Sequence, residues 1–242
     1  CFDHVEDRLS WGSGPSRFAG GAGVIPRKLI TRRSAFLGSV ISIALAIVLG
    51  LVIWIGFGTG PWTIPLGLIG IIGGFFYSSP PLRWVATGYG EIWIGVCYGF
   101  LTVAVGLYLP YGKLTLLSFL VSIPIAATIF NVIFANEYPD YDSDRSANKS
   151  NLLSRVGRER GVWIYSFLSI LANIFFFVSL LAGVPSIALV VYSLPMLVSF
   201  YCVRGFLRGD WKDKDRLEVL CGLGILVNLS TTLSYIIAFA AR

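Results

Sequence analysis

Charged side chains are scarce in this sequence. Asp, Glu, Lys and Arg make up only 13% of the 242 residues, whereas 55% are hydrophobic and the mean hydropathy is +0.76. This composition is typical of a membrane protein. No polar stretch is long enough to form a separate soluble domain, so we expect residues 1–242 to form a single membrane-embedded domain.

Cysteine and histidine are also few. The four cysteines show no paired spacing and mostly lie in apolar stretches, so we interpret them as small apolar fillers. The single histidine, His4, is interpreted as a neighbour of the acidic residues around it and not as a metal ligand. The chain begins with Cys1 where a Met would be expected, and we interpret this as truncation of a longer protein.

Seven apolar stretches are each close to the roughly 20 residues that a membrane-spanning helix needs. They cover residues 34–57, 61–77, 88–109, 114–136, 161–183, 185–203 and 218–240. The second stretch is the shortest. The sequence therefore predicts an all-α, polytopic transmembrane helix bundle.

Basic residues are distributed very unevenly between the two ends of this predicted bundle. The joints between stretches alternate between the two faces of the membrane, and 17 of the 19 Lys and Arg residues fall on one face. The positive-inside rule places that face in the cytoplasm, which predicts an inner (cytoplasmic) membrane protein. The net charge of +6 is thus explained by topology, and we expect no nucleic-acid partner, although the basic face can attract an anionic substrate or lipid.

An acidic motif directly follows the fourth apolar stretch. It contains Asn136, Asp140 and Asp144, spaced by four residues. On a helix, such positions point the same way, so the three side chains would form one face at the end of the membrane span. Such a face suits a divalent metal ion.

A partial copy of this spacing lies at the start of the chain, where Asp3 and Asp7 are also four residues apart. Two carboxylate clusters at the same membrane depth can hold Mg²⁺ ions, whose remaining ligands are waters and substrate phosphates. The alternative is that these acids are solvated loop residues. Carboxylates at a membrane edge favour the functional interpretation.

Several further polar residues surround the two acidic motifs. Arg17 and Lys28 flank a glycine-rich segment that can fold back over the first motif, and Arg83 follows Pro80 and Pro81. Arg145 and Lys149 follow the second motif, where cations suit a polyphosphate lying between metal and protein. Glu91, at the start of an apolar stretch, either pairs with a loop arginine or orients a substrate hydroxyl, and we favour the pairing.

These motifs resemble those of the UbiA superfamily of intramembrane prenyltransferases. The spacing of Asn136, Asp140 and Asp144 resembles the second aspartate motif of that family, and Asp3 and Asp7 resemble the first, whose leading Asn would precede Cys1. Family members have nine helices, and their first motif lies at the end of the second helix. A chain that begins at this motif is therefore expected to keep seven helices. The segments Tyr77-Ser-Ser-Pro-Pro-Leu-Arg83 and Gly88-Tyr-Gly-Glu91 are also similar to family loops, so that the resemblance covers essentially the whole chain.

Within the family, the glycine-rich segment and Gly88-Tyr-Gly-Glu91 look most like the menaquinone-pathway members, which prenylate 1,4-dihydroxy-2-naphthoate. The loop after the second motif departs from the usual Gly-Lys-Arg-Thr/Asn-Leu pattern. Here it reads Asn148-Lys149-Ser150-Asn151-Leu152, so the lysine is kept and the next cation is absent.

The resemblance implies an enzyme, a Mg²⁺-dependent polyprenyltransferase. Mg²⁺ would join the four motif aspartates, Asp3, Asp7, Asp140 and Asp144, to the diphosphate of a polyprenyl donor, and Arg17, Lys28, Arg83, Arg145 and Lys149 would surround that diphosphate. Asn136, Tyr77 and Glu91 are further substrate-binding candidates. An allylic cation shielded by aromatic faces such as Tyr77, Tyr98 or Phe134 would be attacked by an aromatic acceptor, while the tail lies in the lipid bilayer.

Other functions remain open at this stage. The acceptor could be 4-hydroxybenzoate or another quinone or lipid precursor. The chain could also be a cation transporter or a lipid-binding membrane protein without turnover. The acidic clusters lie at one membrane face, whereas transporter sites usually lie near the midplane, which argues against transport.

Overall fold

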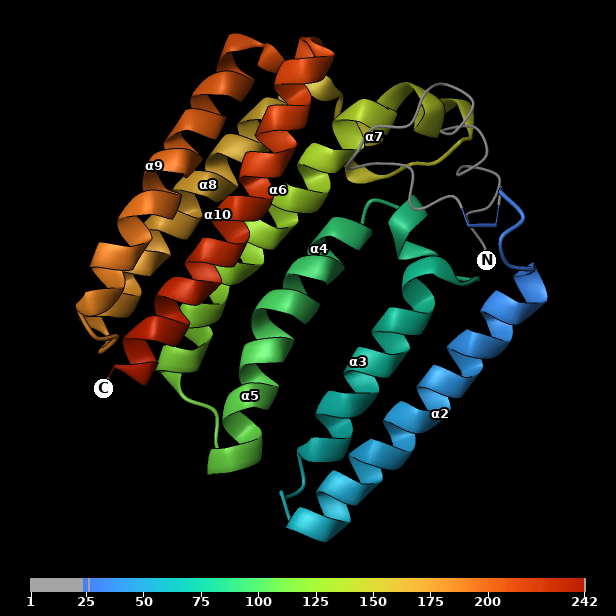
Figure 1. Ribbon diagram of the computed structural model, residues 1–242, viewed down its shortest axis with the longest axis vertical. Helices are drawn as coiled ribbons and strands as arrows, with labels where there is room; N and C mark the ends of the chain where they lie inside the picture. Colours follow the sequence, from blue (N-terminus) through green and yellow to red (C-terminus); the bar gives the residue numbers. More distant parts are fainter. Residues whose placement is uncertain (1–23, 26, 242) are drawn as a thin grey trace.

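The computed structural model describes residues 24, 25 and 27–241, and this part of the chain is helical without any strand (Figure 1). Its membrane-length elements are α2 (Arg32–Phe57), α4 with η2 and α5 (Gly90–Tyr111), α6 (Leu116–Ser146), α8 (Arg158–Leu181), α9 (Ile187–Arg208) and α10 (Lys214–Ala240). These six spans are long and apolar enough to cross a membrane, and α3 (Thr63–Ser78) is a shorter apolar helix. The predicted polytopic helix bundle and its seven apolar elements are confirmed.

Short elements connect several of these spans. They are η1 (Trp84–Ala86) before α4, α7 (Leu152–Val156) between α6 and α8, and η3 (Asp210–Lys212) before α10. The third span is one continuous rod made of α4 (Gly90–Ile94), the π-helical η2 (Gly95–Leu101) and α5 (Thr102–Tyr111). Both η1 and α7 lie at the end of the bundle that carries the acidic motif (Figure 1).

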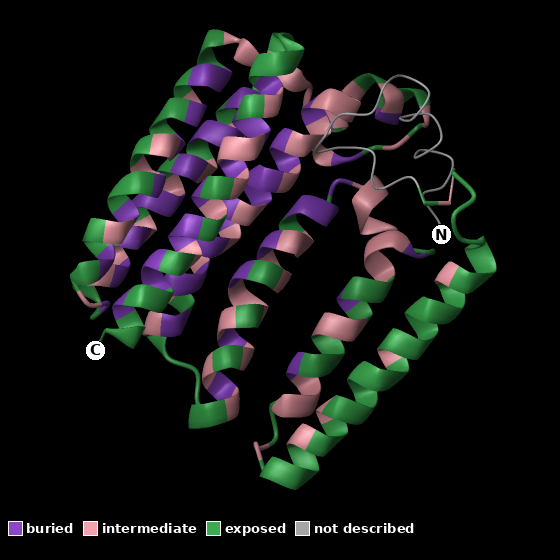
Figure 2. Ribbon diagram, in the orientation of Figure 1, coloured by how far each residue is buried: buried purple, intermediate pink, exposed green. Residues whose placement is uncertain are grey.

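Helix α6 is the centre of the packed half of the molecule. It packs against α8, α10 and η2, and it contributes Phe130, Phe134 and Tyr138 to an aromatic core completed by Tyr165 of α8 and Phe206 of α9. Figure 2 shows most of the buried residues in this half. By contrast, α2 has no buried residue, which is the pattern expected for an apolar helix that faces lipid.

Amide side chains inside the membrane-length helices join neighbouring helices. The Asn228 Nδ2 of α10 donates to the Thr128 Oγ1 of α6 at 3.0 Å. The Asn173 Oδ1 of α8 accepts a hydrogen bond from the Tyr192 hydroxyl of α9 at 3.3 Å. Such bonds satisfy polar groups that lipid cannot solvate.

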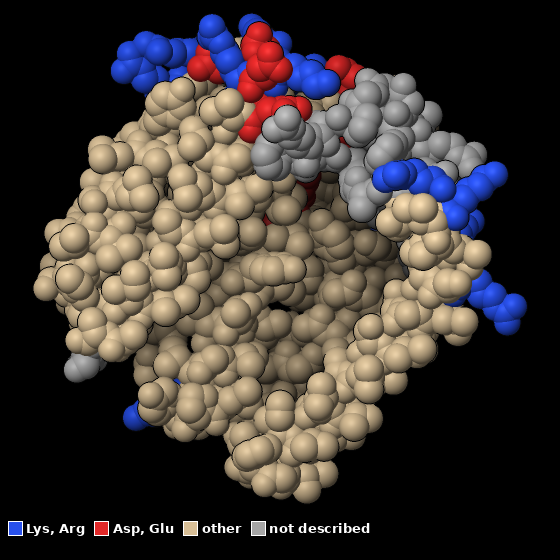
Figure 3. Space-filling model, viewed as in Figure 1, with Lys and Arg blue, Asp and Glu red and all other residues tan. Residues whose placement is uncertain are grey.

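Helix α6 extends further than its apolar stretch predicted. It begins at a capping box formed by Thr115 and Ser118, and it continues through Pro139 to Ser146, whereas the apolar stretch ends at residue 136. The whole acidic motif is therefore helical. This places the motif as a rigid extension of a membrane span at the end where Lys, Arg, Asp and Glu gather (Figure 3).

Candidate active site

The acidic motif forms one face of the last turns of α6. Asn136, Asp140 and Asp144 follow the i, i+4, i+8 spacing within a continuous helix, as predicted, and the carboxylates of Asp140 and Asp144 interact electrostatically. The Asn136 Oδ1 is buried and accepts no hydrogen bond in the described structure. A buried amide oxygen without a partner is unusual and is available to a ligand.

Asp144 is held by two residues of the loop that follows α6. Its side chain is buried, and its Oδ2 accepts a hydrogen bond from the Asn151 Nδ2 at 2.7 Å. The Lys149 Nζ lies 3.1 Å from the same oxygen and 3.3 Å from Oδ1. Lys149 was predicted to contact a diphosphate, and in this structure it pairs with Asp144 of the acidic motif itself. Asn151 is a contact that the sequence analysis missed.

The loop itself is fixed from two sides. The Glu91 Oε1, at the start of α4, accepts a hydrogen bond from the Leu152 N at 2.8 Å. The Ser150 N donates to the Ala86 O at 3.1 Å. Two loops that are about 60 residues apart in sequence thus dock on each other beside the acidic face.

Glu91 has a structural partner, but it is not an arginine. No arginine in the described part of the chain pairs with its carboxylate, which is buried against the Leu152 amide and the carboxyl of Glu137. The Glu137 Oε2 in turn accepts a hydrogen bond from the Leu153 N at 3.4 Å. Glu137 was not predicted to take part, although its position between Asn136 and Asp140 in a largely apolar span was a signal for it.

Arg145 does not join the acidic face. Its Nη1 donates to the Tyr141 hydroxyl at 3.2 Å, and its guanidinium lies 5.6 Å from the centre of the same ring. On the same flank, the Arg158 Nη2 lies 3.0 Å from the Oδ2 of the exposed Asp142. The reason is helical geometry, because Arg145 follows Asp144 directly and points about 100° away from it.

The other predicted cations and Tyr77 are less closely tied to this face. Arg83 is half-buried just before η1, with a left-handed backbone (φ 40°). Lys28 is exposed in the turn before α2. Tyr77 lies at the end of α3, half-buried. Asp3, Asp7 and Arg17 lie outside the described residues.

The chemistry of the acidic face fits a hard divalent ion. Its donors are all oxygens, namely two carboxylates and the unpartnered amide oxygen of Asn136, and Mg²⁺ prefers oxygen ligands. Among residues 24, 25 and 27–241, no group of three or more His, Cys, Asp or Glu side chains is placed to hold an ion. Substrate phosphates and waters typically complete the shell of Mg²⁺ in proteins.

A pocket of about 450 Å³ lies between α3 and the third span. Tyr77, Trp93 and Tyr98 line it, together with Gly70 and Gly74 of α3. On the side of the third span, Tyr98 belongs to the π-helical part, η2. Phe134 was the third aromatic residue predicted to shield the allylic cation. It does not line this pocket, because it is fully buried in the core around α6.

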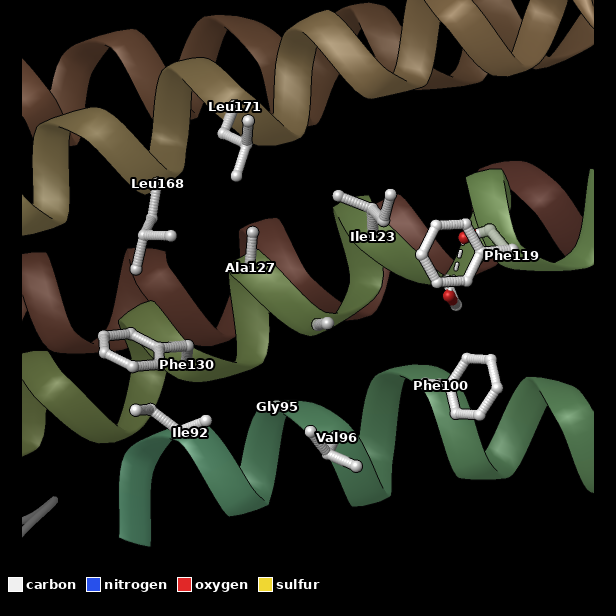
Figure 4. A pocket seen from close by; sticks show the side chains of 12 residues that line it. Ile92, Gly95, Val96, Phe100, Phe119, Ile123, Ala127, Phe130, Leu168 and Leu171 are labelled. Carbon is white, nitrogen blue, oxygen red and sulfur yellow. Dashed lines mark hydrogen bonds between the residues drawn. The ribbon is translucent and has the colours of Figure 1, made fainter. Parts of the chain in front are cut away.

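A second, largely apolar groove of about 330 Å³ lies on the flank of α6 (Figure 4). Ile92 and Phe100 line it from the third span, Phe130 from α6 and Leu168 from α8. Phe130 and Asn136 are six residues apart, so their side chains point about 120° apart around the helix. The groove therefore does not share the face that carries the acidic motif.

Comparison with known proteins agrees with these features. The chain matches the model of the UbiA prenyltransferase family over residues 22–230. It is 25% identical over 200 residues to a 1,4-dihydroxy-2-naphthoate octaprenyltransferase of Bacillus subtilis, an alignment that covers 80% of this chain and 64% of that protein. A protein of the same name from Mycobacterium tuberculosis is 28% identical over 169 residues, which is 70% of this chain and 55% of that protein.

A third relative, the UbiA prenyltransferase domain-containing protein 1 of Dictyostelium discoideum, is 30% identical over 114 residues, or 47% of this chain and 34% of that protein. The alignments thus span less than two thirds of these relatives' length. No solved structure matches the chain. Because the family model matches most of the sequence and the acidic motif is placed as the resemblance implied, this chain belongs to the UbiA prenyltransferase family.

Proposed function

We propose that this protein transfers a polyprenyl group from an allylic diphosphate to an aromatic acceptor, with Mg²⁺ as cofactor. The observation that carries the proposal is the oxygen-lined face of α6. There, Asn136 Oδ1 has no hydrogen-bond partner among the described residues, and Asp144 is held beside Lys149. Membership of the UbiA family supports the reaction class.

Some residues of the site would hold the metal ion, and others would contact the diphosphate, when the allylic carbon–oxygen bond breaks. Asn136, Asp140 and Asp144 would hold the metal from α6, and Asp3 and Asp7 are proposed to do so from the start of the chain. A bound divalent ion would supply positive charge that stabilises the departing diphosphate. Lys149 adds a fixed cation on the same side, and Arg83 and Arg17 are proposed as further diphosphate contacts.

The pocket between α3 and the third span is proposed to receive the reacting end of the isoprenoid. When the carbon–oxygen bond breaks, its electron pair leaves with the diphosphate and an allylic cation remains. The ring faces of Tyr77 and Tyr98 can stabilise that cation, and the apolar walls exclude water. The acceptor ring then forms the new carbon–carbon bond and releases a proton, or carbon dioxide if a carboxylate is replaced.

For the acceptor we propose 1,4-dihydroxy-2-naphthoate. The support is that two relatives that align over most of this chain are named 1,4-dihydroxy-2-naphthoate octaprenyltransferase, together with the similar loop sequences. The excess of basic residues at the acidic end supports a cytoplasmic active site, and the polyprenyl tail would extend into the bilayer.

The test is transfer by the purified protein in nanodiscs. Radiolabelled octaprenyl diphosphate is supplied with 1,4-dihydroxy-2-naphthoate or with 4-hydroxybenzoate, in Mg²⁺ or in EDTA, and prenylated product and free diphosphate are measured. We expect product only with the naphthoate and Mg²⁺. Product with 4-hydroxybenzoate alone would overturn the acceptor assignment, and absence of product with both acceptors, alongside cation flux in liposomes, would overturn the reaction class.

A further inference from the structure

We propose that Asn151 is a positioning residue for the metal site: its side-chain amide fixes the carboxylate of Asp144 in the orientation that binds the ion. This inference rests on the proposed function. Asn151 lies outside the acidic motif and is almost fully buried, with 1% of its surface exposed.

Both ends of the Asn151 amide are used, which fixes its orientation. Nδ2 donates to the Asp144 Oδ2 at 2.7 Å, and Oδ1 accepts from the Ser154 N at 2.9 Å. A carboxylate oxygen only accepts and a backbone N–H only donates, so the amide can satisfy both neighbours in one orientation alone. The orientation of the hydrogen bond from Asn151 to Asp144 is therefore fixed.

The backbone that carries Asn151 is held on both sides. The preceding residue, Ser150, donates its N–H to the Ala86 O and accepts at its O from the Arg155 Nε at 2.8 Å. The following residue, Leu152, donates its N–H to the buried Glu91 Oε1. Because each flanking peptide would lose a hydrogen bond on turning, this backbone resists following a movement of Asp144.

Close packing at Gly88 also holds the loop of residues 150–152 in place. A Cβ at Gly88 would lie 3.1 Å from the Arg155 Nε and 3.3 Å from the Ser150 O, and its φ of +74° favours glycine. The segment that resembles a family loop, Gly88-Tyr-Gly-Glu91, thus supports the acidic face indirectly. It fixes the loop that presents Asn151 to Asp144.

Helix capping alone does not explain Asn151. A cap for α7 needs only an acceptor for the Ser154 N, which serine supplies as well as asparagine does. The additional N–H donor is directed at Asp144. Residues that orient metal ligands in this way typically change metal affinity by about 10- to 100-fold when they are removed.

Asn151→Ser separates the two roles, because it keeps the cap and removes the donor to Asp144. Binding of Mn²⁺ alone, without substrates, is followed by electron paramagnetic resonance of the purified protein, and the melting temperature is measured in the same detergent. We expect Mn²⁺ affinity to fall about 10- to 100-fold with little change in melting temperature. Asn148→Ser, the same change at an exposed position of the loop, is the matched control and should bind Mn²⁺ as the wild type does.

If Asn151→Ser folds poorly, a second pair of variants tests the hydrogen bond from the Leu152 N to Glu91 that holds this loop. Glu91→Ala removes the acceptor for the Leu152 N and should weaken Mn²⁺ binding, whereas Glu91→Gln keeps an acceptor and should restore it. Unchanged Mn²⁺ affinity in Asn151→Ser, or in Glu91→Ala, would overturn the positioning role. Equal Mn²⁺ binding by wild type and Asp140→Asn, or none by the wild type, would instead show that the proposed metal site itself is wrong.

Discussion

Asp140 and Asp142 are two residues apart on α6, yet their side chains face different surroundings. Asp140 is half-buried on the face shared with Asn136 and Asp144. Asp142 is exposed and pairs with Arg158 on the opposite flank. The helix, and not the local density of charge, therefore decides which acids can act together.

Lys149 and Arg145 provide a test of this separation. Lys149→Gln removes the cation beside Asp144, and we expect kcat/KM for the prenyl diphosphate to fall about 10- to 100-fold because a charge-assisted contact is lost. Arg145→Gln removes an equal charge that stacks on Tyr141, and we expect less than about a threefold change. Equal losses in the two variants would show that only the total positive charge matters.

The sequence predicted part of this site and missed the rest for a physical reason. The spacing of Asn136, Asp140 and Asp144 was sufficient to predict one helical face, because helical periodicity is local. The contact between Asn151 and Asp144 depends on a loop that folds back after α6, and the Glu91 contact with the Leu152 N depends on two loops distant in sequence. Neither is visible in the spacing of residues along one element.

At the level of helices, the glycines of α3 have unequal roles. A Cβ at Gly73 would clash with the Trp93 ring, whereas a Cβ at Gly67 meets nothing within 4 Å. Gly73 therefore allows α3 to pack closely against Trp93, and Gly74 instead lines the aromatic pocket.

Gly73→Ala should separate α3 from α4. The added methyl group clashes with the half-buried ring of Trp93, and we expect a loss of about 1–3 kcal/mol in stability. Gly67→Ala, on the same helix, should leave stability unchanged or raise it, because alanine favours a helix more than glycine does. Thermal unfolding of both variants in detergent checks this, and equal melting temperatures would contradict the packing role of Gly73.

The helices themselves were well predicted because apolar length is a strong signal for a membrane span. Their ends were predicted less well. The extension of α6 to Ser146 passes through Pro139 and several charged residues, which no measure of hydropathy favours. The π-helical stretch Gly95–Leu101 was also missed, and it places Gly95 and Gly99 against Ala126 of α6, a contact that only the packed bundle reveals.

For the whole molecule, the strongest organising feature is the gathering of charged residues at one end (Figure 3). The acidic motif, the docked loops and most of the basic residues share that end. An anionic diphosphate would be drawn to it, and an apolar tail would extend from it into the bilayer. The positions of the basic residues along the sequence predicted this asymmetry. That the basic end faces the cytoplasm is a prediction that labelling can test.

Asn148→Cys and Lys113→Cys place a thiol at exposed positions on opposite ends of the bundle. If the basic end is cytoplasmic, a membrane-impermeant maleimide should label Lys113→Cys in intact cells and Asn148→Cys only after permeabilisation. The unsubstituted protein controls for its own cysteines. The reverse pattern of labelling would place the active site outside the cytoplasm.

We propose that the face of Asn136, Asp140 and Asp144 holds the metal and diphosphate during prenyl transfer. The most direct measurement is Mg²⁺-dependent diphosphate release from octaprenyl diphosphate in the presence of the acceptor, compared between Asp140→Ala and Asp142→Ala. We expect release to be abolished in Asp140→Ala and largely retained in Asp142→Ala, whose carboxylate pairs with Arg158 away from the site. Retained release in Asp140→Ala, or equal loss in both variants, would contradict this account.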